Sequence, residues 1–274
     1  MEDGSVNGPE EKRPSAGTRL KGIFTPLPAT LLPWIIVLSA WEILVRVLHV
    51  SPSLLPGPLA VLKGLAEIFA SGVLIDHIVA SLFRVSWGYA LAIATAIPLG
   101  LLLGLVPTMH RLANPIVQFL RPISPLAWIP LALLWFGIGD RSAIFIIYLS
   151  VVLPLTVFTT SGIFRIRPIY RMVAQNYGIR GWELARTVIL PGAFPEIVVG
   201  LRITLGTAWL VIVAAEMIAV RSGLGYLILD ARNSLRMDLV VGGMLVIGGI
   251  GLLLDTLVSL LRRLPEARWP RMER

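Results

Sequence analysis

The sequence contains no cysteine, which excludes disulfides, thiolate nucleophiles and cysteine-ligated metals. Charged residues are also scarce, at 15% of the 274 residues, whereas an ordinary soluble domain has roughly a quarter. The three histidines lie far apart, and no serine-hydrolase or histidine-pair motif is present. A nucleotide-binding P-loop needs a Gly-Lys pair, and no lysine here follows a glycine. We therefore expect no catalytic residue, no metal site and no ATP site in this chain.

Hydrophobic residues are abundant, at 56% of the chain, and the mean hydropathy is +0.81. A soluble core of this length cannot hide so much apolar surface, so much of it must face lipid. The sequence predicts an all-α integral membrane protein with six spans of about 20 or more residues. These spans are 29–49, 82–106, 112–137, 142–164, 197–220 and 239–262.

Basic residues indicate the orientation of these spans. If the N-terminus is cytoplasmic, fifteen of the 24 Lys and Arg residues lie in inside segments and six in outside segments. Because positive residues collect on the cytoplasmic side, both termini are predicted to be cytoplasmic. The net charge of +8 is then a signal of topology and not of nucleic-acid binding. Residues 1–28 and 265–274 are expected to form cytoplasmic tails around a transmembrane domain at 29–264.

Two further segments have recognisable patterns. Apolar residues recur at helical spacing from Leu59 to Phe69, which predicts a short amphipathic helix within an external segment at 51–81. The second span has a small residue at every fourth position, so that another helix can approach it closely. These small residues are Gly88, Ala92, Ala96, Gly100 and Gly104.

The third span is interrupted by prolines within the run from Arg121 to Pro130, which predicts a broken helix. Irregular backbone at membrane depth survives only against protein or a water-filled cavity, so the break marks either a crowded interface or a transport path. Ionisable residues within spans must pair, face the interior or snorkel. We expect Arg84 and Arg202, near span ends, to snorkel, and Glu216 to pair with an arginine or to line the path.

The segment at 165–196 is long for a connection between helices and lies on the predicted cytoplasmic side. It predicts two amphipathic helices, Tyr170–Tyr177 and Gly181–Leu190, separated by Gly178 and ended by Pro191 and Pro195. Periodicity alone leaves two interpretations open: a docking site for a soluble partner, or a pair of helices on the membrane surface.

This segment resembles the cytoplasmic loop of import-type ABC transporter permeases. That loop reads Glu-Ala-Ala, three residues, Gly, nine residues, Ile, any residue, Leu-Pro. The chain has Met172-Val-Ala174, Gly178 and Val188-Ile-Leu-Pro191 at the same spacing, with Met172, Val173 and Val188 as departures. Further stretches are similar to the nitrate/sulfonate/taurine branch and to its aliphatic sulfonate permeases most of all. They are 55–58, 121–131, 190–202, 208–217 and 222–226.

The resemblance implies a type I importer fold in the bacterial inner membrane and a homodimer of this chain. It also implies a cytoplasmic ATPase dimer, which would bind ATP and Mg²⁺, and an external solute-binding protein. The loop would couple the permease to the ATPase. Its residues are Met172, Val173, Ala174, Tyr177, Gly178, Trp182, Val188, Leu190 and Pro191.

The expected function is import of a small anion, with an alkanesulfonate as the leading solute. Taurine, nitrate, bicarbonate and a thiamine-precursor pyrimidine are alternatives, and a secondary transporter is the alternative of another class. A secondary transporter should show inverted halves, and no such repeat is evident. The guanidinium of Arg121 suits sulfonate oxygens. Candidate path residues are Arg121, Ser124, Trp128, Trp209 and Glu216.

Overall fold

The computed structural model describes residues 27–48, 51 and 54–260, with side chains described from residue 32 onward. The chain divides into two compact units, residues 1–50 and 51–274. In the first unit, the helix α1 (Leu27–Val47) coincides with the first predicted span, and Glu42 pairs with Arg46 at 2.6 Å. The predicted tails, apart from residues 27 and 28, lie outside the described residues, as does the end of the sixth predicted span.

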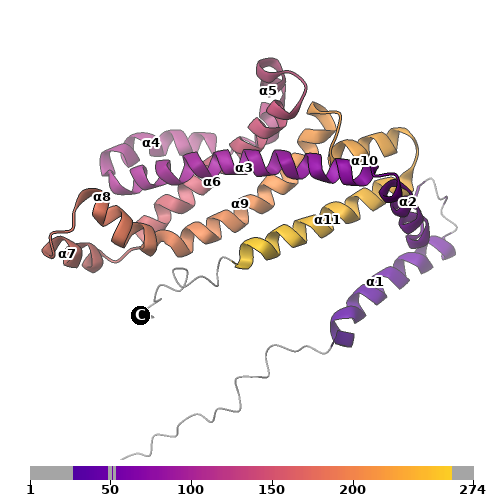
Figure 1. Cartoon of the computed structure of the whole chain (residues 1–274), viewed down its shortest axis with the longest axis horizontal. Coiled ribbons are helices and arrows are strands. Elements are labelled where there is room, and N and C mark those ends of the chain that lie inside the picture. The colour runs from indigo at the N-terminus through magenta and orange to yellow at the C-terminus, as the bar shows by residue number, and fades with distance from the viewer. Residues whose placement is uncertain (1–26, 49–50, 52–53, 261–274) are drawn as a thin grey trace, which may run out of the picture. The chain divides into compact units, whose positions relative to one another are not determined.

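In the second unit, all regular secondary structure of the described residues is helical (Figure 1). A 3₁₀ turn (Pro125–Trp128) precedes α5, and a π-helical turn (Ala185–Ile189) joins α8 to α9. The helices are α2 (Pro58–Ala70), α3 (Val73–Leu105), α4 (Pro107–Leu120), α5 (Ile129–Phe136), α6 (Asp140–Phe164), α7 (Pro168–Asn176), α8 (Gly181–Leu184), α9 (Leu190–Ala219), α10 (Leu224–Asn233) and α11 (Met237–Leu260).

Four helical stretches of this unit are long and apolar enough to cross a membrane: α3, α6, the continuous run Gly181–Ala219, and α11. They confirm the second, fourth, fifth and sixth predicted spans as helices, although α3 begins well before the predicted residue 82. The third predicted span is broken as expected, because α4 and the stretch Pro125–Phe136 meet at an angle of 85°.

The core of the unit lies where α6 packs between α3 and α9. The predicted stripe of small residues on α3 faces α6: a Cβ added at Gly88 would lie 2.7 Å from Cβ of Ile147. On the other side of α6, a Cβ at Gly200 of α9 would lie 2.6 Å from Cβ of Phe158. Because these glycines have no side chain, three long helices pack at close distance, which is how membrane helices gain dispersion energy without a hydrophobic driving force.

The prediction that Pro191 and Pro195 end the second cytoplasmic helix is wrong. The helix runs without interruption from Gly181 to Ala219. Pro191 lies just after a π-helical turn and Pro195 lies within α9, so each proline removes one backbone hydrogen bond without ending the helix. This π-helical turn, closed by a bond from the Leu190 amide to the Ala185 carbonyl, adjusts the register of the two segments.

The two ends of this unit differ (Figure 1). At one end, α2 and α10 pack against α11, and Arg236 joins them by ion pairs to Glu67 at 2.9 Å and Asp238 at 2.8 Å. These hydrogen bonds to Asp238 and Glu67 raise the pKa of Arg236 above its already high value, so it stays charged. The helix α2 confirms the predicted amphipathic helix, and it buries Val61. The opposite end contains α7 and α8.

Candidate functional site

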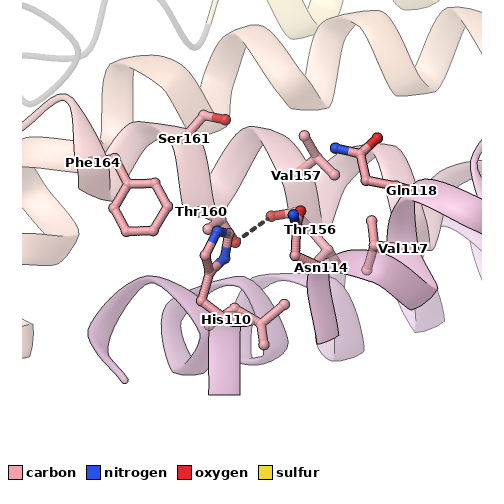
Figure 2. Close-up of a pocket in the computed structure, with 10 residues that line it drawn as sticks. His110, Asn114, Val117, Gln118, Thr156, Val157, Thr160, Ser161 and Phe164 are labelled. Atoms are coloured by element: carbon pink, nitrogen blue, oxygen red, sulfur yellow. Dashed lines mark hydrogen bonds between the residues drawn. The ribbon is translucent and has the colours of Figure 1, made fainter. Parts of the chain in front are cut away.

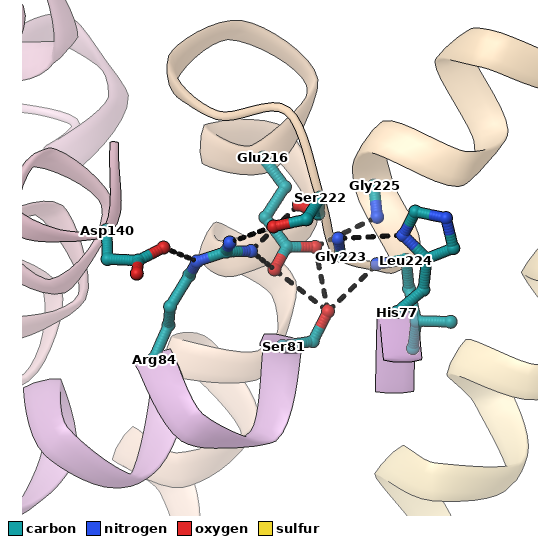
Figure 3. Close-up of polar contacts among 9 residues, drawn as sticks. All are labelled: His77, Ser81, Arg84, Asp140, Glu216, Ser222, Gly223, Leu224 and Gly225. Carbon is teal, nitrogen blue, oxygen red and sulfur yellow. Dashed lines mark hydrogen bonds and ion pairs between the residues drawn. The ribbon is translucent and has the colours of Figure 1, made fainter. Parts of the chain in front are cut away.

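A buried polar network connects α3, α6, α9 and the start of α10 (Figure 3). Arg84 donates to Asp140 at 2.8 Å through Nε and to Glu216 at 2.7 Å through Nη1, and it also reaches the carbonyl and hydroxyl of Ser222. Ser81 donates to both carboxylate oxygens of Glu216, at 2.8 and 2.9 Å. A buried ion pair is tolerated only when its remaining donors and acceptors are satisfied, and this network satisfies them.

The expectation that Arg84 snorkels is therefore wrong, because only 2% of the residue is exposed. Its two carboxylate partners lie far away in the sequence and compensate its charge within the protein. Arg202 is also paired, through two hydrogen bonds of 2.6 Å to Asp255 on α11. For Glu216, the structure shows the arginine pairing that the sequence left open as one alternative.

The network also caps the N-terminus of α10, a helix that the sequence analysis did not predict. The amides of Leu224 and Gly225 donate to Ser81 Oγ at 2.8 Å and to Glu216 Oε2 at 2.9 Å. The Gly223 amide donates to Nδ1 of His77 at 3.0 Å. A carboxylate is favoured at a helix N-terminus. Glu216 therefore stabilises the start of α10 and also compensates the charge of Arg84. Periodicity cannot find such partners, since they lie in four separate segments.

The break between α4 and α5 contains three of the five candidate path residues. Arg121 is the C-cap of α4 and is exposed, and within the described residues its side chain makes no ion pair. Ser124 caps the following 3₁₀ turn by accepting from the Leu126 amide at 3.3 Å, and Trp128 ends that turn half-buried. Among the described residues, the break therefore contains an exposed guanidinium without an ion pair and, seven residues later, a half-buried aromatic side chain.

The other two candidates have different surroundings. Trp209 is buried on α9, and its Nε1 donates to the Ile247 carbonyl of α11 at 3.0 Å, so its contacts are those of a packing residue. Glu216 is fully buried in the network around Arg84. Neither side chain shares a partner with Arg121 among the contacts of the described residues.

A cavity of about 220 Å³ lies between α4 and α6 (Figure 2). Its α4 wall includes His110, Asn114 and Gln118, which recur one helical turn apart. The α6 wall includes Thr156 and Thr160. Sequence analysis missed this cavity, although the polar residues at every fourth position of α4 were a readable signal.

The segment around Gly178 forms a sharp elbow at one end of the unit. Gly178 has φ of +79°, and the amides of Gly178 and Ile179 close a Schellman motif on Gln175 and Ala174, both at 3.0 Å. At the tip, 82% of Tyr177 and 76% of Trp182 are exposed. The other predicted coupling residues are arranged from tip to base: Met172 and Val173 are exposed, Ala174 is buried, and Val188, Leu190 and Pro191 are half-buried.

The base of the elbow is anchored in a small second core, where Ile189 packs with Ile163 and Ile197. A buried base and an exposed aromatic tip fit a surface that another protein covers, because exposed patches of large apolar side chains often mark interaction sites. Tyr and Trp are also the residue types that carry most of the energy of protein interfaces.

Comparison with known proteins identifies the family. Residues 96–270 match the family described as "Binding-protein-dependent transport system inner membrane component". The chain is 41% identical to the putative ABC transporter permease protein MJ0413 of Methanocaldococcus jannaschii, over 78% of this chain and 82% of that protein. It is 38% identical to the taurine transport system permease protein TauC of Escherichia coli, over 83% and 85% of the two chains. It is 37% identical to the putative aliphatic sulfonates transport permease protein SsuC of the same organism, over 89% and 95%.

A solved structure supports the fold. The chain superposes on a chain of the MetNI methionine ABC transporter, solved in inward-facing conformations, with a TM-score of 0.54 and 20% sequence identity. The match covers 69% of this chain and 96% of that one. The resemblance read from the loop around Gly178 is confirmed. The chain is a non-catalytic, multi-pass subunit of the inner membrane, and it belongs to the ABC importer permeases, in the branch that includes the taurine and aliphatic sulfonate permeases.

Proposed function

We propose that this permease forms the membrane path for a small organic anion of the alkanesulfonate type, driven by ATP hydrolysis on a separate subunit. The observation that carries the proposal is Arg121, an exposed guanidinium without an ion pair in the described residues, at the break of a membrane span. A charge at this depth is costly unless it faces water, a partner chain or a solute.

The chemistry of Arg121 favours an oxyanion. A guanidinium presents a planar fork of N–H donors that matches two oxygens of a sulfonate or carboxylate. A neutral pyrimidine gains much less from this charge. Nitrate and bicarbonate remain alternatives of the same charge, and taurine, which has a sulfonate group, falls within the proposed class.

The relatives support the class of solute without selecting one member of it. The two Escherichia coli permeases, named for taurine and for aliphatic sulfonates, are almost equally similar to this chain, at 38% and 37% identity. In importers that depend on a binding protein, that external protein also selects the solute. We therefore assign the path to sulfonates as a group and propose an external solute-binding protein as the partner that selects among them.

The elbow at Gly178 is proposed as the coupling site. Its exposed aromatic tip would fit a cleft on each subunit of a cytoplasmic ATPase dimer, and its buried base would pass movement directly into the unbroken helix that continues to Ala219. ATP and Mg²⁺ would be bound by the ATPase. The same proposal includes six crossings with α1 as the first, both termini in the cytoplasm, and a homodimer of this chain.

Reconstituted transport tests the proposal. The permease is placed in proteoliposomes with its ATPase and its binding protein, and uptake of radiolabelled taurine and ethanesulfonate is measured. We expect uptake that requires ATP and that stops with an ATPase variant unable to hydrolyse it. Uptake driven by an ion gradient without the ATPase would instead indicate the secondary-transporter alternative. ATP-driven uptake of an uncharged solute, but of neither sulfonate, would refute the assignment to anions.

A further inference from the structure

We propose that the cavity between α4 and α6 is the inner half of the anion path, with His110, Asn114 and Gln118 as its hydrogen-bond donors. The inference rests on the proposed function and adds a binding region to it. It starts from a property of α4, which buries none of its side chains although it forms half of a membrane span.

The two faces of α4 are chemically different. The face toward α6 carries His110, Asn114 and Gln118, which line the cavity (Figure 2). The other side carries exposed apolar side chains, such as Leu112 and Ile116. Apolar groups suit lipid or a second copy of the chain, whereas amides at this depth need water, solute or protein partners. The polar face is therefore the side that a hydrated solute can use.

The hydrogen-bonding capacity of the cavity favours an anion. The hydroxyls of Thr156 and Thr160 donate to backbone carbonyls of their own helix, Val152 at 2.7 Å and Thr156 at 2.9 Å. In contrast, within the part of the chain that the structure describes, the side chains of Asn114 and Gln118 make no hydrogen bond, so their N–H donors remain available. No acidic residue lines the cavity. A wall with unpaired N–H donors and no carboxylate can bind the oxygens of an anion, and it offers no negative charge to neutralise a cation.

The His110 ring is positioned by packing. It lies edge-to-face against Phe164, with centroids 4.9 Å apart and an interplanar angle of 84°. This contact holds the imidazole at the end of the cavity near the start of α4, and it leaves the ring nitrogens available because they make no hydrogen bond in the described structure.

The polar residues on the cavity face of α4 continue toward Arg121. Gln118 lies about 16 Å along α4 from Pro107 at 1.5 Å per residue, close to half of the roughly 30 Å hydrocarbon thickness. Arg121 follows three residues later, on a neighbouring face and at the break. The cavity volume of about 220 Å³ corresponds to several water molecules at about 30 Å³ each, or to one small organic anion. The donors would thus continue from the guanidinium toward the start of α4.

Cysteine labelling tests this inference directly, because the natural chain contains no cysteine. Single variants Asn114→Cys and Gln118→Cys are compared with Ile116→Cys on the opposite side of the same helix. The transporter, assembled with its ATPase in lipid nanodiscs, is treated with 2-sulfonatoethyl methanethiosulfonate, itself an alkanesulfonate, or with its trimethylammonium counterpart. In each reaction the thiolate displaces methanesulfinate and forms a mixed disulfide. Each labelling rate is divided by the rate at which the same reagent reacts with a small thiol in solution, which corrects for the different reactivities of the two reagents.

We expect the anionic reagent to label residues 114 and 118 roughly tenfold faster than residue 116, and faster than the cationic reagent does. Equal rates on both sides of α4, or a preference for the cationic reagent, would overturn the inference. If a variant on α4 fails to assemble, Ser161→Cys on the α6 wall of the cavity replaces it, and its labelling rates are compared with those of Ile116→Cys in the same way.

Uptake by the wild-type preparation distinguishes the two proposals. ATP-driven taurine or ethanesulfonate uptake, together with slow labelling of residues 114 and 118, would refute the cavity as the inner path and leave the proposed function standing. Fast anionic labelling without uptake of either sulfonate would refute the proposed solute class, and with it the assignment of this cavity to that solute.

Discussion

Arg84 and Glu216, 132 residues apart in the sequence, form an ion pair of 2.7 Å in which neither side chain is more than 3% exposed. The pair connects α3 to α9, and Asp140 extends it to α6. The three helices that form the core are thus held together by one guanidinium near their ends. This restraint is purely electrostatic and polar, whereas the middle of the same helices is held by close packing at glycines.

Removing this guanidinium should destabilise the protein strongly. In Arg84→Met, the fully buried carboxylate of Glu216 keeps only neutral donors, and an uncompensated buried charge of this kind costs about 3–5 kcal/mol. The matched change Asp140→Asn should cost less than about 1 kcal/mol, because the Asp140 side chain is 55% exposed. Thermal unfolding of the purified protein in detergent measures both. Equal losses for the two variants would show that burial does not decide the energy of this network.

Glycines on α3 provide a second test. A Cβ at Gly100 would lie 2.5 Å from Cβ of Thr159 and 2.9 Å from the Thr156 carbonyl, so Gly100→Ala should force α3 away from α6 and cost about 1–3 kcal/mol. The matched control is Gly206→Ala on α9, where nothing lies within 4 Å of the added Cβ. Melting temperatures of the two variants should differ by several degrees. A Gly100→Ala protein as stable as the control would contradict the close packing.

The sequence predicted the long elements well because their signals are local. A span needs about 20 apolar residues in a row, and the proline cluster after Arg121 directly indicates the break between α4 and α5. The stripe that includes Gly88 and Gly100 is likewise a local pattern, and it predicted a close helix contact. None of these predictions required knowledge of which helices are neighbours.

The site was less predictable, for the opposite reason. Arg84 was expected to snorkel because its position near a span end suggested it, whereas its partners Asp140 and Glu216 become neighbours only after folding. The polar residues at every fourth position of α4 indicated a polar helix face, but their spacing could not show that a gap between α4 and α6 lies beside them. Pro191 was expected to end a helix, and only the preceding π-helical turn explains why it does not.

The elbow makes a third prediction. Gly178→Arg should weaken copurification of the ATPase and abolish ATP-driven uptake, because the new side chain protrudes from the exposed tip. Gly178 has a φ of +79°, so part of any effect will be backbone strain. Gly72→Arg is the matched control: its φ is +80°, it also has nothing within 4 Å of an added Cβ, and it lies between α2 and α3.

The two glycine variants should lose similar stability, while only Gly178→Arg loses the ATPase. Quantification of the ATPase bound per permease, together with thermal unfolding, separates the two effects. If Gly178→Arg copurifies with the ATPase and transports as well as Gly72→Arg, the elbow is not the coupling site.

Arg121 gives the last prediction. Hydrogen bonds to charged groups contribute about 1.5–3 kcal/mol, so Arg121→Ala should lower uptake of taurine or ethanesulfonate at low concentration by roughly 10- to 100-fold. Arg121→Lys keeps the charge but not the planar fork, and we expect an intermediate value. Because the residue is exposed and unpaired in the described structure, protein abundance and basal ATPase activity should stay near wild type. Initial rates over a range of solute concentrations in proteoliposomes would show the loss. Unchanged transport by Arg121→Ala would remove this residue from the path and leave the donors of α4 to be tested without it.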